Sequence, residues 1–484
     1  MNYLDLVRLA LPEIILVVTA LAVLSIGLAR NRLSGICSGV TAAGLLFAAA
    51  AVLQLPPHAQ LFHGMLVISP LNSLFEIVCL ALAFFTVILT RGERSQPDGG
   101  EFLALILLAT VGLMLLVGSE ELLMIFIGLE LTGLSLYVLT AFDKADTNSA
   151  EAGLKYFLFG SMASAFTLFG LSYIYGLTGT TALGAIASKM SAAPVQPLLM
   201  AGIVMTLIGF GFKIAAAPFH LWAPDAYQGA PIPAAAFIAS GSKVASFVVL
   251  GKIVLAGFGP AHGSADWHAM VGGWSPVLAA LAALSIVVGN LTALAQRNAR
   301  RLLAYSAVAH AGYTLLGLVA AGREGFSATL FYTTIYAITL VGAFGVVAFV
   351  RRETGGDDLS DFAGLRDRSP LLAGCMAIFL LSLAGLPPLA GFFGKFYLFS
   401  ATLRAGADHG LLWLVALALF GSLISLYYYL IVLKIIFADE SKPIGFADHP
   451  DFLQRLTLSL LAAAVLLFGI IPGTLVNWII ASFS

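Results

Sequence analysis

The chain alternates long apolar runs with short polar connectors along its whole length. Fourteen of the runs approach the about 20 apolar residues that a membrane-spanning helix needs. Lipid offers no partner to a free backbone N–H or C=O group, so each run must be helical. The pattern therefore predicts an all-α polytopic membrane protein with about 14 transmembrane helices. They lie near residues 11–29, 33–55, 70–90, 102–118, 121–141, 153–176, 198–217, 231–254, 276–295, 302–320, 326–350, 371–403, 411–437 and 454–479.

Two of the predicted spans contain residues that interrupt a helix. The seventh carries Pro218, and the twelfth carries Pro387 and Pro388 between glycines. An interior proline removes a helix hydrogen bond and clashes with the preceding turn. A broken helix at membrane depth is tolerated only inside protein or beside a wet cavity. The two breaks therefore mark the places where polar chemistry is expected.

The spacing of the breaks predicts the domain organisation. They lie five spans apart, and an odd number of spans inverts the second copy of a repeat, as in many ion-coupled transporters. We expect two inverted five-helix repeats, each containing a broken helix. The predicted units are the first three spans, the first repeat, the second repeat and the last span, at residues 1–100, 101–255, 270–440 and 450–484.

Lysine and arginine are distributed unequally between the two sides. Fourteen spans place both termini on one side, which carries five basic residues: Arg8, Lys189, Lys252, Arg323 and Arg404. The other side carries fifteen: Arg30, Arg32, Arg91, Arg94, Lys144, Lys155, Arg297, Arg300, Arg301, Arg351, Arg352, Arg366, Arg368, Lys442 and Arg455. Basic residues accumulate in the cytoplasm, so both termini are predicted to lie outside.

The composition excludes several classes of protein. Hydrophobic residues make up 60% of the chain and charged residues 10%, against about 25% charged in a soluble domain. No basic stretch could track nucleic-acid phosphates. The chain has three cysteines, Cys37, Cys79 and Cys375, which lie in apolar runs without C-x-x-C spacing. We therefore expect no metal site, iron–sulfur site or disulfide framework. No glycine-rich phosphate loop follows a strand, and we expect no cofactor in this chain.

A small set of ionisable residues falls inside the predicted spans. Each charge at the centre of the bilayer costs about 2.5–3.5 kcal/mol on insertion scales, so such residues usually have a function. Lys252 and Lys434 lie near span ends and are expected to reach the interface, and Glu76 is expected to be structural or interfacial. The central residues are expected to form ion pairs or to carry protons: Glu130, Lys213, Lys243 and Lys395, with His220, His310 and Lys155 beside them.

Several motifs resemble those of the antiporter-like proton-pumping subunits of respiratory complex I. The run from Lys213 through Pro218, His220 and Trp222 to Pro231 resembles the signature of that family. Glu130 in the fifth span and the segment 301–313 resemble it as well. Within the family, segments 150–160 and 385–395, the second with Lys395, are most similar to the N subunits of the bacterial NADH:quinone oxidoreductase.

This resemblance implies how the buried residues would work. Glu130 and Lys213 would form an ion pair on the cytoplasmic half-channel. Lys243 would be the central proton carrier, and Lys395 would pass the proton outward. The supporting positions along the hydrated path would be His220, His310 and Lys155.

The resemblance also implies partners and a location. The chain would be a subunit of a proton-translocating NADH:quinone oxidoreductase in the bacterial inner membrane, without a redox site of its own. Flavin and iron–sulfur clusters are expected in partner subunits, and subunit M and small membrane subunits would be its neighbours in a hetero-oligomer. A subunit of an Mrp-type cation/proton antiporter could have the same charges and stays an alternative, and so does a scaffold without transport.

Overall fold

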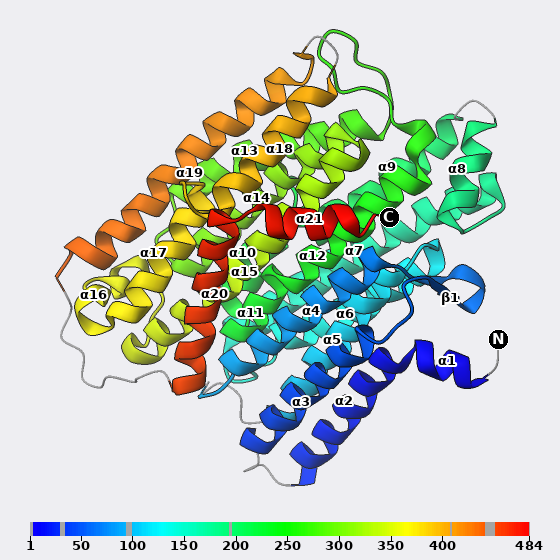
Figure 1. The fold of residues 1–484 in the computed structure, drawn as a ribbon. Helices are drawn as coiled ribbons and strands as arrows, with labels where there is room; N and C mark the ends of the chain where they lie inside the picture. The colour runs from blue at the N-terminus through cyan, green and yellow to red at the C-terminus, as the bar shows by residue number, and fades with distance from the viewer. Residues whose placement is uncertain are drawn as a thin grey trace.

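The computed structural model describes residues 3–29, 34–92, 99–192, 196–406, 409–440 and 451–483, and Figure 1 shows them as a bundle of long helices. Within these residues, 12 helices are long and apolar enough to cross a membrane. Two shorter apolar helices, α9 (Pro197–Lys213) and α17 (Pro370–Ala384), belong to the broken spans. These long and short apolar helices together confirm the predicted all-α polytopic architecture.

The first three predicted spans are single helices. Their order is α2 (Leu11–Ala29), α3 (Ser34–Val52) and α4 (Pro70–Leu89). Three small elements that the hydropathy pattern did not predict accompany them: helix α1 (Tyr3–Leu9) and the antiparallel strands β1 (Ala59–Leu61) and β2 (Leu66–Ile68). Ala59 pairs with Ile68, and Leu61 pairs with Leu66.

Spans four to eight contain both intact and interrupted helices. The elements in chain order are α5 (Gly99–Gly118), α6 (Leu122–Thr140), α7 (Thr147–Thr178), the short α8 (Leu183–Ser191), α9, α10 (Trp222–Gly229), α11 (Ile232–Ala239), α12 (Gly241–Lys252) and a π-helical turn, η2 (Ile253–Gly257). Side chains cap the helix starts: the Glu121 carboxylate accepts a bond from the Met124 N–H at the start of α6, and Asp146 accepts from Asn148 at the start of α7.

Spans nine to fourteen complete the bundle. They are α13 (Trp274–Leu294), α14 (Ala299–Ala320), α15 (Gly322–Thr354), α17, α18 (Ala390–Ala405), α19 (Leu412–Ala438) and α20 (Phe452–Ile470), followed by α21 (Gly473–Ala481), with the four-residue α16 (Leu365–Arg368) before α17. Asn298 caps α14 by accepting bonds from the N–H groups of Arg300 and Arg301.

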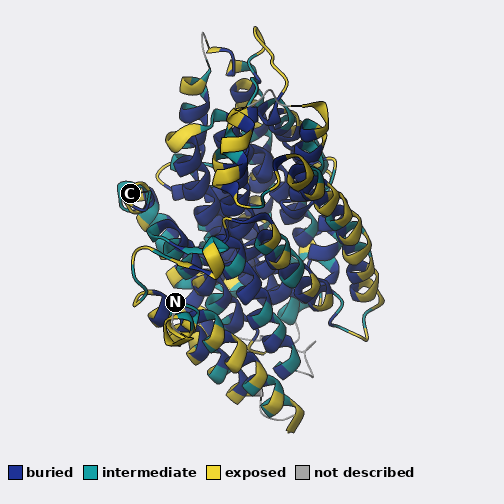
Figure 2. Cartoon of the chain, turned by 90° about the vertical axis from the view of Figure 1, so that its right-hand side faces the viewer, coloured by how far each residue is buried: buried dark blue, intermediate teal, exposed yellow. Residues whose placement is uncertain are grey.

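Three spans form the centre of the molecule. In the α11–α12 span, α14 and α15, 94% of the residues in an 18-residue apolar stretch are buried. In the corresponding stretches of α2 and α7, only 28% and 33% are buried. A helix that is apolar all round has to be surrounded by other helices or by lipid, and these three are surrounded by protein. Figure 2 shows the buried residues through the middle of the molecule and the exposed ones on the peripheral helices.

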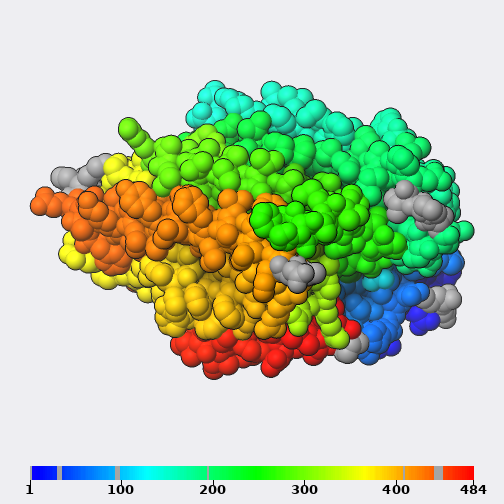
Figure 3. Space-filling view, turned by 90° about the horizontal axis from the view of Figure 1, so that it is seen from above, coloured from blue at the N-terminus to red at the C-terminus, as the bar shows by residue number. Residues whose placement is uncertain are grey.

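The N-terminal and C-terminal helices share one side of the bundle. In Figure 3 the blue and red segments lie along the same edge, and the cyan segment lies along the opposite edge. Helix α20 packs against α4 and α15. Figure 1 places α1 and α21 toward the same end of the bundle as α8, in agreement with an even number of spans.

The structure refines two predicted spans. The eighth, predicted at 231–254, is confirmed as one apolar span over Ile232–Gly257, with a kink at Ser240, whose hydroxyl donates back to the Ala236 carbonyl, a bond that bends helices. The fourteenth, predicted at 454–479, ends at Ile470 because Pro472 follows, and α21 then turns across the bundle (Figure 1). The repeat boundaries stay predictions. Of the basic residues counted for orientation, Arg30, Arg32, Arg94 and Lys442 lie outside the described residues.

Candidate functional site: a buried line of lysines, histidines and tyrosines

Five of the seven predicted site residues have side chains inside the protein. Lys243 and His310 are each 2% exposed, and the other three are also buried: Lys213, His220 and Lys395. Lys213 ends α9, and His220 lies in the interrupted segment that follows. Lys243 lies on α12, His310 on α14 and Lys395 on α18. Glu130 is half-buried on α6, and Lys155 lies nearer the surface on α7.

Glu130 and Lys213 are neighbours but are not in direct contact. The Glu130 carboxylate accepts a hydrogen bond from the hydroxyl of Ser164 on α7. Within the part of the chain that the structure describes, no ion pair of 4 Å or less joins Glu130 to Lys213, although the charge of Glu130 acts on that ammonium. Helix α7 packs against both α6 and α9. The predicted ion pair therefore requires a movement of one of the two side chains.

The first break places His220 inside the bundle. Helix α9 ends at Lys213, and the indole N–H of Trp222 donates to the Phe212 carbonyl, 3.0 Å away, which also accepts a bond from the Ala215 N–H. The His220 ring lies 6.2 Å from the ring of Tyr305 on α14. Among the described residues, its buried Nδ1 atom has no hydrogen-bond partner. A buried polar atom of this kind is ordinarily satisfied by water.

Lys243 lies in the first turn of α12, immediately after the kink at Ser240 that separates α11 from α12. Its ammonium donates to the Ala307 carbonyl of α14 at 2.7 Å and lies 5.4 Å from the ring centre of Tyr336 on α15. A carbonyl has two lone pairs, so it can accept this bond in addition to its helical one. Lys243 is held by a carbonyl dipole and a π face, and no carboxylate of the described residues forms an ion pair with it.

His310 lies between two tyrosine hydroxyls. Its Nδ1 is 2.6 Å from the hydroxyl of Tyr332, and its Nε2 is 3.2 Å from that of Tyr429. The Tyr336 ring, which also faces Lys243, lies 5.1 Å from the imidazole. Because one nitrogen of a neutral imidazole donates and the other accepts, His310 can join two hydroxyls into one hydrogen-bonded chain.

The second break provides the partner of Lys395. Helix α17 ends at Ala384, and the Lys395 ammonium donates to that terminal carbonyl at 2.9 Å and to the hydroxyl of Ser422 on α19 at 2.8 Å. It also lies 5.1 Å from the ring centre of Tyr313, and this ring lies 5.6 Å from that of His310. Ring contacts therefore connect Lys243 through Tyr336, His310 and Tyr313 to Lys395, whereas no hydrogen bond among the described residues joins His310 to either lysine.

The sequence analysis missed the tyrosines of this line. They are Tyr313 on α14, Tyr332 and Tyr336 on α15, and Tyr429 on α19, whose hydroxyl also bonds Ser306. A signal was present, because Tyr332 and Tyr336 lie one helical turn apart, with Thr333 and Thr334 between them, inside a predicted span. Buried tyrosine hydroxyls require partners, so their presence inside a span indicates a polar interior.

Lys155 belongs to a different cluster, at one end of the bundle. Its side chain is 40% exposed and pairs with Glu151 at 2.6 Å and Asp225 at 2.8 Å, and Asp225 also pairs with Arg301 at 2.7 Å. Its partner carboxylates Glu151 and Asp225 line a polar cavity of about 360 Å³, together with Gln228 and Arg301. Among the residues described, no group of three or more His, Cys, Asp and Glu side chains is placed to bind a metal ion.

Lys252 corrects one sequence expectation. It was expected to reach the membrane interface, but it is buried, and its ammonium donates to the Asn72 side chain and the Val117 carbonyl, both at 2.6 Å. The buried Glu76 acts on it through charge. The expectation was wrong because α12 continues into the turn η2 inside the protein, and distance to the end of an apolar run does not show what surrounds that end.

Comparisons with known proteins fit this geometry. The profile described as NADH:quinone oxidoreductase/Mrp antiporter, TM matches residues 119–425, more than half of the chain. The chain belongs to this family. It is 47% identical to NADH-quinone oxidoreductase subunit N 2 of Acidobacterium capsulatum, over 99% of each chain.

Two solved structures place the family fold in two kinds of complex. A chain of respiratory complex I from Thermus thermophilus is 35% identical, with a TM-score of 0.79 over 96% of this chain and 98% of that chain. A chain of the Mrp complex from Dietzia sp. has a TM-score of 0.82 over 99% and 97%, at 20% identity. The second likeness shows the shared fold alone.

Proposed function

We propose that the chain is the N subunit of a bacterial NADH:quinone oxidoreductase and that it carries protons across the membrane. The observation that carries this proposal is the line of buried lysine, histidine and tyrosine side chains in ring contact from Lys243 to Lys395. Its relatives of high identity and nearly full coverage are named subunit N, which favours this complex over the Mrp antiporters. NADH oxidation and quinone reduction belong to other subunits.

Protons would be taken up at the polar cavity beside Lys155 and Asp225. That cavity opens at the end of the bundle where the described basic residues gather in ion pairs, such as Arg91 with Asp451 and Arg368 with Glu353. Basic residues stay on the cytoplasmic side. This gathering supports a cytoplasmic position for the cavity and a periplasmic position for both termini.

The central transfer would use the two lysines in turn. Lys243 is held by a carbonyl and a ring, so it can release its proton without breaking an ion pair. Because only ring contacts separate these groups, water would carry the proton from Lys243 to His310 and on to Lys395, whose partners are a helix-end carbonyl and Ser422. The approach and separation of Glu130 and Lys213 would control when Lys243 is loaded.

The energies involved are comparable. Moving one charge against a potential of about 150 mV costs about 3.5 kcal/mol, from about 2.3 kcal/mol per 100 mV. A carboxylate–ammonium contact at 4 Å contributes about 4 kcal/mol at an effective dielectric constant near 20. One change in the Glu130–Lys213 contact per cycle is therefore of the right size to drive one transfer.

The inverted repeat is part of the same proposal. In the predicted units the third helices are α7 and α15, of 32 and 33 residues, the two longest helices of the described chain. Each packs against the broken span that follows it: α7 against α9 and α10, α15 against α17 and α18. These matched features support two copies of one five-helix unit, at 101–255 and 270–440.

The partners are proposed from the relatives. The solved relative from Thermus thermophilus is part of respiratory complex I. We expect subunit M and small membrane subunits beside this chain, with flavin and iron–sulfur clusters in other partner subunits. Purification of the tagged chain with its native partners tests this: flavin and iron–sulfur absorbance should accompany NADH:quinone activity, and a colourless, sodium-dependent assembly would favour the Mrp alternative.

The decisive test of transport is Lys243→Ala in the assembled complex. We expect normal assembly and a loss of NADH-driven proton uptake into membrane vesicles. Lys434→Ala is the matched control, because Lys434 is an exposed lysine of α19, a peripheral helix. Undiminished pumping by a fully assembled Lys243→Ala complex would refute the proposed route and favour the scaffold.

A further inference from the structure

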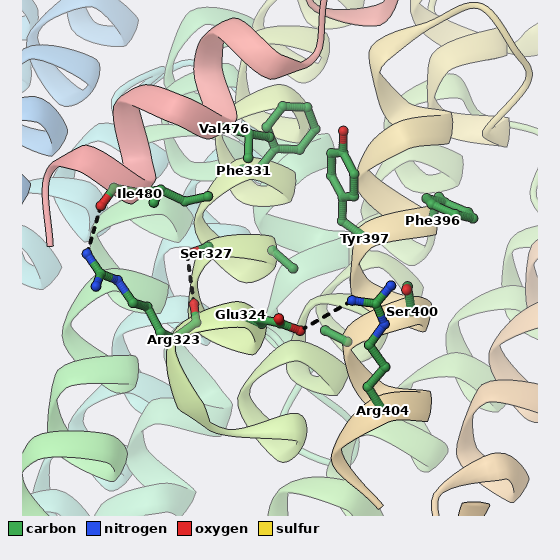
Figure 4. A pocket seen from close by; sticks show the side chains of 12 residues that line it. Arg323, Glu324, Ser327, Phe331, Phe396, Tyr397, Ser400, Arg404, Val476 and Ile480 are labelled. Atoms are coloured by element: carbon green, nitrogen blue, oxygen red, sulfur yellow. Dashed lines mark hydrogen bonds and ion pairs between the residues drawn. The ribbon is translucent and has the colours of Figure 1, made fainter.

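A cavity separate from the buried polar line lies between α15, α18 and α21. Its volume is about 460 Å³, within the range of about 300–1,000 Å³ that is usual for small-molecule pockets. Its walls are mainly apolar and aromatic, with contributions from Phe331, Phe396, Tyr397, Val476 and Ile480. Figure 4 shows these side chains around the space, with the charged residues gathered toward one side.

The charged side of the cavity holds two arginines and one glutamate. Arg404 lies 3.9 Å from Glu324, and their side chains are 72% and 73% exposed, so this pair is weak. Arg323 donates to the Ile480 carbonyl at 3.0 Å and lies 5.3 Å from the ring centre of Phe483. A guanidinium has five N–H donors, so both arginines have donors to offer an oxygen-rich anion.

The charges and the walls together select a class of ligand. Two arginines and one glutamate leave one positive charge, and arginine binds phosphate through two parallel hydrogen bonds. The apolar walls suit a hydrocarbon chain. Helix α21, which closes one side, exposes Trp478 and Ile480 and lies across the bundle (Figure 1), as a helix at a bilayer surface does.

We propose that this cavity binds one anionic phospholipid. Its phosphate lies at the charged side of the cavity, where Arg323 and Arg404 stand on either side of Glu324 (Figure 4), and part of an acyl chain lies against Phe331 and Val476. A headgroup with a single negative charge neutralises the site, whereas a zwitterionic headgroup leaves it with an unbalanced positive charge. The bound lipid fills the space between α18 and α21 and thereby connects the half-helix that carries Lys395 to the C-terminal helix.

Photocrosslinking in the native membrane tests the identity of the ligand. A benzophenone amino acid replaces Tyr397, a residue of the cavity wall, in the full chain within its assembled complex. The matched control places the same probe at Tyr427 on α19, which is exposed on a peripheral helix and reports the average composition of the surrounding lipid. Mass spectrometry of the adducts should show a several-fold enrichment of anionic phospholipid at position 397 over position 427.

Charge variants test the proposed contacts. Arg323→Gln combined with Arg404→Gln should abolish the enrichment, and Arg404→Gln alone, at an exposed position that the fold tolerates, should reduce it. Arg8→Gln, an exposed arginine of α1, should leave it unchanged. Equal lipid composition at the two probe positions, enrichment of a zwitterionic lipid, a crosslink to a neighbouring protein, or an enrichment that Arg404→Gln leaves intact would overturn the proposal.

Discussion

His310 offers the sharpest separation of a relay role from a structural one. Replacing it with glutamine keeps a hydrogen-bonding amide near the hydroxyls of Tyr332 and Tyr429, which lie 2.6 and 3.2 Å from the imidazole nitrogens. The amide cannot take up a proton at physiological pH. We therefore expect His310→Gln to assemble normally and to pump poorly.

The structural cost of the glutamine is small. It loses about one hydrogen bond, worth about 0.5–1.5 kcal/mol. His310→Ala costs more, because it leaves the Tyr332 hydroxyl without the imidazole, about 1–3 kcal/mol for a buried unsatisfied group. It also opens a cavity of the kind that costs about 2–5 kcal/mol in large-to-small substitutions.

The effect on pumping follows from the spacing of the line. The rings of Tyr336 and Tyr313 lie 5.1 and 5.6 Å from the imidazole, on the sides of Lys243 and Lys395 respectively. His310 is therefore the ionisable step between the two lysines. A rise of only about 1.4 kcal/mol in the transfer barrier slows pumping about tenfold, and we expect at least this loss in both variants.

The assay measures proton uptake per NADH oxidised in proteoliposomes, with thermal unfolding of the same preparations. The relay predicts equal pumping defects in His310→Gln and His310→Ala, with a larger thermal destabilisation in the alanine variant. Pumping by His310→Gln at the unsubstituted rate would refute the reasoning. A pumping loss that merely follows thermal stability would reduce His310 to a structural role.

Three further substitutions probe the surroundings of the line. Asp225→Asn breaks two partly exposed ion pairs worth at most about 1 kcal/mol each, so stability should change little while stopped-flow proton uptake slows. Lys252→Met leaves the Asn72 side chain and the Val117 carbonyl without their donor and should lower stability by about 1–3 kcal/mol in calorimetry, whereas the exposed control Lys189→Met should have no effect. Ser285→Ala removes the 2.8 Å bond that holds the first break through the Ala217 N–H, and should lower the melting temperature by an amount equivalent to about 1 kcal/mol.

The sequence predicted the spans and the buried charges because hydropathy and membrane depth follow from residue counts along a helix. Lys243 was placed at mid-membrane on this basis, and its side chain is buried inside the protein. Residue counts do not show what lies beyond the end of an apolar run, and so Lys252 was assigned to the interface. Apolar residues continue on both sides of Pro472, so the hydropathy pattern ran on to residue 479, although α20 ends at Ile470.

The contacts between side chains were not predictable in the same way. Resemblance implied a Glu130–Lys213 pair, but whether the two groups touch depends on how α6, α7 and α9 pack. The tyrosines of the line were overlooked because an aromatic residue in an apolar run is ordinarily read as lipid-facing or as core. Their role becomes visible only in the packed structure, where α14, α15 and α19 bring the hydroxyls of Tyr332 and Tyr429 within hydrogen-bond distance of His310.

The two breaks have a consequence for local opening of the molecule. Helices α14 and α15 are continuous over 22 and 33 residues, and 94% of the residues in the apolar stretch of each are buried. Their amide hydrogens should therefore exchange with solvent only on the slowest timescales. The segments 214–221 and 385–389 interrupt the helical hydrogen bonds of the two broken spans. Deuterium should therefore reach the centre of the membrane domain first at these two segments, and the rate of its uptake there would report how often water enters the path of the proton.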